Sequence, residues 1–173
     1  QLAPIYATGG SPGDILQARI ISAAEVSFIL AEAAMKGWNV GNAEDHYNNA
    51  IMQSLATWGQ ADAYDSFIAE PDVAYDGTME QLITQKWVAN WTAATEAWMD
   101  YRRTGLPVLQ AGPASSQPAV AVRFPYGNDE LNNNTTNANT AIERLEVTQF
   151  SGPVGADSQW SKMWVLQETG KPW

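Results

Sequence analysis

The chain has 173 residues, of which 45% are hydrophobic, so it is long and apolar enough to bury a sizeable core in one domain. Its 19 acidic and 9 basic residues give a formal charge of −10, which argues against nucleic acid and against an anionic membrane surface as the main partner. There is no cysteine, so disulfides, thiol nucleophiles and cysteine-bound metals are excluded.

The first twenty residues are rich in glycine, proline and serine and are predicted to form a loop. Ser22 and Glu25 have the spacing of a capping box, which predicts a helix that runs to about Lys36 and stops at Gly37. The longest apolar run, near Val26–Met35, is too short to span a bilayer and is interrupted by a glutamate.

A second helix is predicted after Asn42, which is a suitable N-cap, with two acidic residues in the first turn. This helix should end at Gly59. Its apolar face comprises Tyr47, Ala50, Ile51, Leu55 and Trp58. The two predicted helices and their short turn are typical of one tetratricopeptide-type unit.

Further helices follow in the middle of the chain. A short helix is predicted over Ala63–Ile68, with a turn around Pro71 and Asp72. Thr78 and Gln81 again have capping-box spacing, so a helix should begin there. After a short break, a second helix should run through Ala97, Trp98 and Tyr101 until Gly105 and Pro107 stop it.

The last third of the chain is predicted to be less regular. Several prolines make Leu106–Asn134 mostly irregular, with Val120–Phe124 as a possible edge strand. A last helix is predicted over Thr135–Arg144. The predicted fold class is therefore mainly α, with tetratricopeptide-like helix pairs and long irregular loops.

Several motifs occur in an order that resembles the C-terminal region of the SusD/RagB family. The strongest is EAWMDYRRTGLP, at Glu96–Pro107, and ITQKW precedes it. Upstream, Ile21–Trp38 and Ala43–Gly59 are similar to a helix pair of that family. Downstream, RFPYGNDELNNN at Arg123–Asn134 and SQWSKMWVL at Ser158–Leu166 extend the resemblance over most of the chain.

The resemblance implies an α-α superhelix fold and a binding function without catalysis or cofactors. Members are lipid-anchored proteins of the outer membrane, at the cell surface. They bind an oligosaccharide and deliver it to a SusC-like TonB-dependent transporter. They are longer than this chain and begin with a lipoprotein signal, whereas this chain begins Gln1-Leu2-Ala3-Pro4. We therefore expect residues 1–173 to be a C-terminal piece of a longer protein, without the anchor.

One acidic pair could indicate a glycosidase. Glu96 and Asp100 are four residues apart, so they share a helix face, an arrangement that would suit two catalytic carboxylates. Arg102 and Arg103 follow at once, and Asp100 with Arg103 has the spacing of a helical ion pair. We therefore predict structural pairing rather than catalysis, and no catalytic residue.

Eight tryptophans are candidates for sugar stacking, because the C–H face of a pyranose packs on an aromatic ring. Helical spacing predicts that Trp58, Trp87 and Trp98 lie in the core, and Trp38 should pack against the partner helix. Trp160, Trp164 and Trp173 lie outside clear helices and are better candidates for exposure. The spacing alone designates none of these rings as a carbohydrate-binding residue.

No metal site is predicted either. His46 is the only histidine and is predicted to be a solvated helix residue. Asn128–Glu130 and Asn132–Asn134 are rich in oxygen ligands but lack the alternation and glycine of a calcium loop, so a turn and a helix cap are expected there.

Two other functions stay open at this point. The chain could be a helical-repeat domain that binds only protein, or a glycoside hydrolase fragment that uses Glu96 and Asp100. The sequence does not indicate which glycan would be bound.

Overall fold

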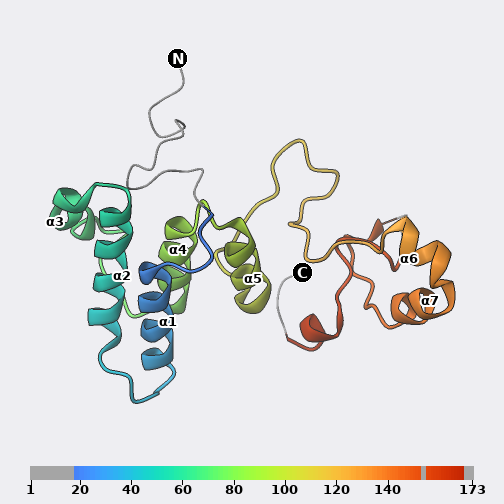
Figure 1. Cartoon of the computed structure of the whole chain (residues 1–173), viewed down its shortest axis with the longest axis horizontal. Coiled ribbons are helices and arrows are strands. Elements are labelled where there is room, and N and C mark those ends of the chain that lie inside the picture. The colour runs from blue at the N-terminus through green and yellow to red at the C-terminus, as the bar shows by residue number, and fades with distance from the viewer. Residues whose placement is uncertain (1–17, 153–154, 170–173) are drawn as a thin grey trace. The chain divides into compact units, whose positions relative to one another are not determined.

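The computed structural model describes residues 18–152 and 155–169, and in these ranges the regular structure is helical, with no strand. The chain divides into two compact units, Gln1–Tyr101 and Arg102–Trp173. Figure 1 shows the helices of both units. The predicted mainly α class is confirmed. None of the helices in the described ranges combines the length and the hydrophobicity that a membrane crossing requires.

The first unit begins with an antiparallel pair of helices, α1 (Ala23–Met35) and α2 (Ala43–Thr57) (Figure 1). Both predicted caps are confirmed. Ser22 Oγ accepts a hydrogen bond from the Glu25 N–H at 3.0 Å, and Asn42 Oδ1 accepts one from the Asp45 N–H at 3.1 Å. These caps satisfy N–H groups that have no partner within the helix, so the start of each helix follows from local sequence.

The core of this pair is built on two aromatic residues. The Phe28 ring on α1 meets the edge of the Tyr47 ring on α2, with centroids 5.9 Å apart. Both side chains are fully buried. The Tyr47 hydroxyl donates to the Val73 carbonyl oxygen at 2.6 Å. Burial, and then the negative charge of Asp76, raise the pKa of Tyr47, so the phenol remains a neutral donor.

The segment after α2 contains a 3₁₀ turn, η2 (Ala61–Ala63), and a short helix, α3 (Tyr64–Ile68). The short helix predicted over Ala63–Ile68 is thus confirmed to within one residue at its start.

The next two helices are α4 (Met79–Ala89) and α5 (Ala94–Thr104). Thr78 Oγ1 caps α4 by accepting from the Gln81 N–H, as predicted. Gln81 does not complete the usual box. Its Oε1 accepts from the Asp76 N–H, and Asp76 in turn accepts from the Thr78 N–H. The turn before α4 therefore takes part in the cap.

A buried cluster of charges links three helices of the first unit. Lys86 Nζ on α4 lies 2.7 Å from Asp100 Oδ2 on α5 and 3.6 Å from Glu25 Oε1 on α1. The side chains of all three residues are at most 12% exposed. Since Lys86 pairs with two carboxylates at low exposure, its loss would break two buried ion pairs, which is strongly destabilising.

The second unit contains α6 (Asn128–Asn133), α7 (Thr135–Glu143) and a 3₁₀ turn, η4 (Trp164–Leu166). The helix predicted over Thr135–Arg144 is confirmed as α7. Helix α6 was missed, because the sequence analysis assigned that segment to a turn within an irregular stretch. This helix is only six residues long, so it shows no helical repeat of apolar residues, and it is rich in asparagine, which has a low helix propensity. Neither signal could therefore predict it.

The edge strand predicted at Val120–Phe124 is wrong. The N–H groups of Val122 and Arg123 both donate to one carbonyl, that of Gln159, at 2.9 and 3.3 Å. A strand ladder would use alternate residues, so these two hydrogen bonds do not have the pattern of a strand.

Arg123 organises the irregular part of the second unit. Its residue is 4% exposed, and Nη1 donates to Asp157 Oδ1 at 2.8 Å and to the Ser158 carbonyl at 3.0 Å. Both carboxylate oxygens of Asp157 also accept from the Tyr126 N–H at 3.2 Å. The ion pair between Arg123 and Asp157 thereby connects two segments of the second unit that are not helical.

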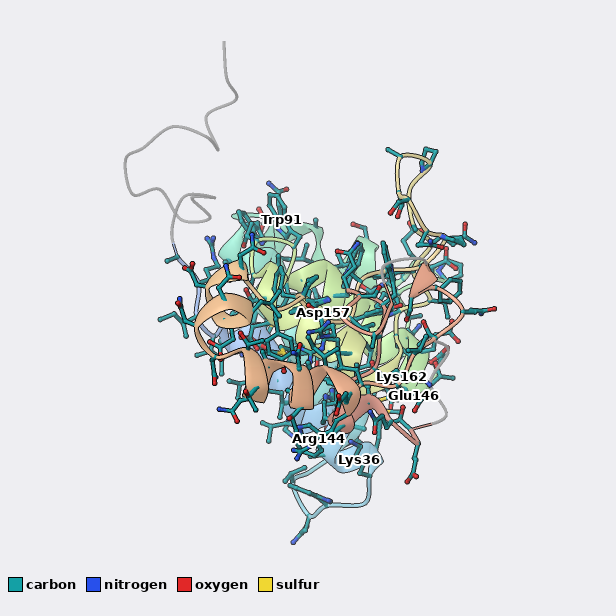
Figure 2. All side chains as sticks on the ribbon, turned by 90° about the vertical axis from the view of Figure 1, so that its right-hand side faces the viewer. Lys36, Trp91, Arg144, Glu146, Asp157 and Lys162 are labelled. Carbon is teal, nitrogen blue, oxygen red and sulfur yellow. The ribbon has the colours of Figure 1, made fainter. Side chains whose placement is uncertain are left out.

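An isolated bridge adds a second connection in this unit. Glu146 and Lys162 exchange two backbone hydrogen bonds of 2.9 and 2.8 Å. Their side chains form an ion pair of 2.8 Å, and Figure 2 shows the two residues next to each other.

Candidate functional site

The acidic pair considered for glycosidase chemistry does not form a site in this structure. Asp100 is buried and paired with Lys86, a partner that the sequence analysis did not consider. Glu96 is half-buried, and its carboxylate makes no hydrogen bond with the described residues. Neither residue lines the two cavities of the first unit that are described below. The geometry supports a structural role for Asp100.

The two arginines after Asp100 differ in environment. Arg102 is half-buried, and its Nη2 donates to the Met163 sulfur at 2.8 Å, within the second unit. Burial lowers the pKa of Arg102. Arg103 is exposed. The Arg102 contact supports the predicted scaffold role of that residue.

His46 is not the solvated residue that was predicted. Its Nε2 lies 2.7 Å from the Val40 carbonyl oxygen, and the side chain is half-buried. A Cβ atom at Gly41 would lie 3.1 Å from the same nitrogen. The His46 ring therefore packs on the turn between α1 and α2 and is hydrogen-bonded to it. Within the described ranges no three His, Asp or Glu side chains are grouped so that they could hold a metal ion.

The largest differences between the predicted and the observed burial concern the tryptophans. Trp87, predicted for the core, is exposed, and Trp58 and Trp98 are only half-buried. Trp38 does not pack against its partner helix but is exposed, and so is Trp164. Trp160 is buried instead, and its Nε1 donates to the Ala119 carbonyl oxygen at 2.9 Å. Trp173 lies outside the described residues.

Two tryptophan rings, those of Trp58 and Trp91, form part of the wall of an apolar cavity of about 240 Å³ in the first unit. Trp58 is the C-cap of α2, and Trp91 follows the C-cap of α4, so two helix ends bring the indoles together. Their centroids are 4.8 Å apart with an interplanar angle of 45°. The other residues that line the cavity are Phe28, Ile51, Ser54, Leu55, Phe67, Gln85, Val88 and Ala89.

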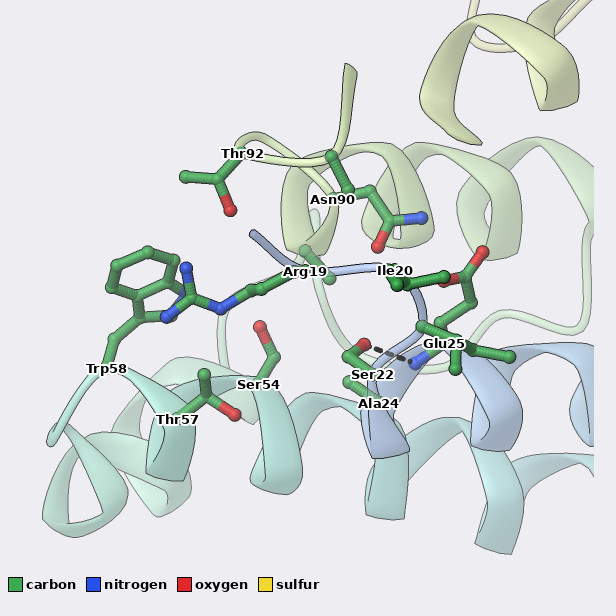
Figure 3. A pocket seen from close by; sticks show the side chains of 13 residues that line it. Arg19, Ile20, Ser22, Ala24, Glu25, Ser54, Thr57, Trp58, Asn90 and Thr92 are labelled. Atoms are coloured by element: carbon green, nitrogen blue, oxygen red, sulfur yellow. Dashed lines mark hydrogen bonds between the residues drawn. The ribbon is translucent and has the colours of Figure 1, made fainter. Parts of the chain in front are cut away.

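A second, much smaller cavity of about 20 Å³ also has Trp58 in its lining (Figure 3). Arg19 places its guanidinium carbon 4.5 Å from the centroid of the Trp58 ring, and Figure 3 shows the guanidinium beside the indole. Asn90 is buried in the same wall, and its Nδ2 has no hydrogen-bond partner in the described part of the chain. This cavity has the size of one water molecule, so a sugar does not fit it.

These contacts leave one ring accessible. Arg19 covers the Trp58 indole, whereas Trp91 is 50% exposed. An exposed indole next to an apolar cavity can stack on the C–H face of a sugar or bind another flat apolar group. Sequence analysis missed this set, because it placed Trp58 in the core and could not show that the ends of two helices meet.

Comparison with known families gives a match over residues 10–127. The matching family is described as "Starch-binding associating with outer membrane" and is named SusD-like. This range covers more than half of the chain, and it includes every residue that lines the two cavities. No curated protein matches the sequence.

Solved structures resemble the chain in fold and sequence. A SusD homolog from Bacteroides fragilis is 30% identical, with a TM-score of 0.67, over 83% of this chain and 34% of its own. A chitin-binding protein is 31% identical, with a TM-score of 0.63, over 83% and 32%. A chitin-binding SusD homolog from Flavobacterium johnsoniae is 26% identical, with a TM-score of 0.63, over 86% and 38%. The chain spans about a third of the length of these proteins.

Proposed function

Because this chain belongs to the SusD-like family, we propose that it is the C-terminal part of a cell-surface protein that binds an oligosaccharide without altering it chemically. The observation that carries this proposal is the family match over residues 10–127, together with the likeness to two structures named as chitin-binding. The exposed Trp91 beside an apolar cavity supports it, since aromatic faces are suited to sugar rings.

The proposal includes the setting that family membership implies. The intact protein is anchored by lipid to the outer membrane and works with a SusC-like TonB-dependent transporter, which takes up the captured glycan. The role of this protein is to hold the ligand and cover the transporter. Binding requires no cofactor, because stacking and hydrogen bonds to hydroxyl groups are sufficient.

The intact protein is expected to bind an oligosaccharide more tightly than this chain does, because the chain has about a third of the length of its relatives and therefore fewer contacts. Isothermal titration of both proteins with chitin, starch and cellulose oligosaccharides would measure this difference. Absence of binding to every glycan by the intact protein would contradict the proposal. Retained binding to the transporter in that case would favour the protein-interaction alternative.

No hydrolysis of these glycans is expected from either protein. Asp100 is buried against Lys86, so the two carboxylates of a retaining mechanism are not presented to a ligand. Release of reducing ends from the same oligosaccharides, followed over a day, is the direct measurement. Turnover that is lost in Glu96→Gln and kept in Glu80→Gln, a matched acidic position on α4, would instead establish a glycoside hydrolase.

A further inference from the structure

We infer that the 240 Å³ cavity accepts the acetamido group of an N-acetylated sugar whose ring stacks on Trp91. This inference rests on the proposed glycan-binding function and adds a site and a ligand class to it.

The size of the cavity limits what can enter. Pockets for drug-sized ligands have volumes of roughly 300–1,000 Å³, so a cavity of about 240 Å³ holds one sugar ring or the substituent of a ring. Trp91 stands at its wall with half of its surface exposed. A ring can therefore lie on the indole while its substituent points into the cavity.

The lining determines which substituent is suitable. Of the ten residues that line the cavity, only Ser54 and Gln85 are polar. An unsubstituted hexose carries hydroxyl groups around its whole rim, and most of them would lose water here without gaining a partner. An acetyl methyl group has no hydrogen bond to lose, so its burial among Phe28, Leu55 and Phe67 is favourable.

The two polar residues complement an amide. The Ser54 hydroxyl lines both cavities and makes no hydrogen bond with the described residues, so it is free to donate to an acetyl carbonyl oxygen. Gln85 Nε2 is directed to the Asp72 carbonyl oxygen at 3.4 Å, which leaves Oε1 as an acceptor. An acetamido group offers one acceptor and one N–H donor. An O-acetyl ester lacks the donor, and a plain hydroxyl lacks the methyl group.

The test uses this chain and two trisaccharides that differ only at one position of each ring. Tri-N-acetylchitotriose carries acetamido groups where cellotriose carries hydroxyl groups. Affinity is measured by tryptophan fluorescence, and saturation-transfer NMR shows which ligand protons approach the protein. The variants are Trp91→Ala and Ser54→Ala, with Trp38→Ala as the control because Trp38 is an exposed tryptophan outside the cavity. Far-UV circular dichroism verifies the fold of each variant.

We expect the acetylated trisaccharide to bind at least tenfold more tightly than cellotriose, with the strongest saturation transfer on its acetyl methyl protons. Trp91→Ala should weaken binding at least tenfold, Ser54→Ala severalfold, and Trp38→Ala less than twofold. Equal affinity for both trisaccharides would refute the acetamido specificity and leave the glycan-binding function standing. Undiminished binding in folded Trp91→Ala would refute the site. If neither sugar binds to the folded chain, the site is again refuted, while titration of the intact protein decides the proposed function separately.

Discussion

Replacement of Lys86 with methionine is expected to lower the free energy of unfolding by about 3–5 kcal/mol. The reason is that Lys86 is the cation between Asp100 and Glu25, and all three side chains are largely buried. Methionine fills a similar volume, so the loss reports on the charges rather than on packing. Chemical denaturation followed by far-UV circular dichroism measures the change.

The matched control is Lys36→Met. Lys36 Nζ also pairs with a glutamate, Glu32, at 2.6 Å, and the side chain of Glu32 is 9% exposed, but that of Lys36 is 52% exposed, so the expected cost is smaller than for Lys86→Met. A triple variant, Lys86→Met with Glu25→Gln and Asp100→Asn, should recover part of the lost stability, since it also removes the two carboxylates that lose their lysine partner. Equal losses for Lys86→Met and Lys36→Met would show that the buried cluster contributes no more than a pair whose lysine is exposed.

Replacement of Arg123 with methionine is expected to cost about 3–5 kcal/mol and to loosen the irregular part of the second unit. Its guanidinium is bound by Asp157 and by the Ser158 carbonyl oxygen in a buried position, and both acceptors would lose this donor, although Asp157 keeps the Tyr126 N–H. Lysine at this position should rescue only in part, because an ammonium group cannot reproduce the planar arrangement of donors.

Two measurements suit this second prediction. Thermal melts give the loss of stability, and amide hydrogen exchange locates it, with faster exchange expected in peptides from residues 119–161. Arg144→Met is the control, because Arg144 is exposed and its change should stay within about 0.5 kcal/mol. Unchanged exchange in those peptides would mean that Asp157 and the segments around it are held by other contacts.

The features that were predicted from sequence are those with a local cause. Ser22, Asn42 and Thr78 each cap a helix through a residue three positions later, so a short window contains the whole interaction. The SusD-like assignment likewise followed from ordered motifs and is confirmed by the family match. Helix starts and family membership were therefore accessible before the structure.

The candidate site was not accessible, because it depends on contacts between distant residues. Helical spacing placed Trp87 in the core, yet in α4 the buried apolar residues are Leu82 and Ile83, and Trp87 is exposed. Spacing shows which residues share a face, but it does not show how many neighbours cover that face. The meeting of Trp58 with Trp91 likewise needs the ends of two helices to converge.

The charge cluster of the first unit also determines where the chain can be divided. Glu25 and Asp100 lie near the two ends of the helical part of this unit, and both pair with Lys86 between them. A shorter piece that began after Glu25 or ended before Asp100 would alter the charge balance around the lysine. Truncations of the first unit should therefore keep residues 25–100 together, and tags, cleavage sites or fusion partners should be placed outside this range.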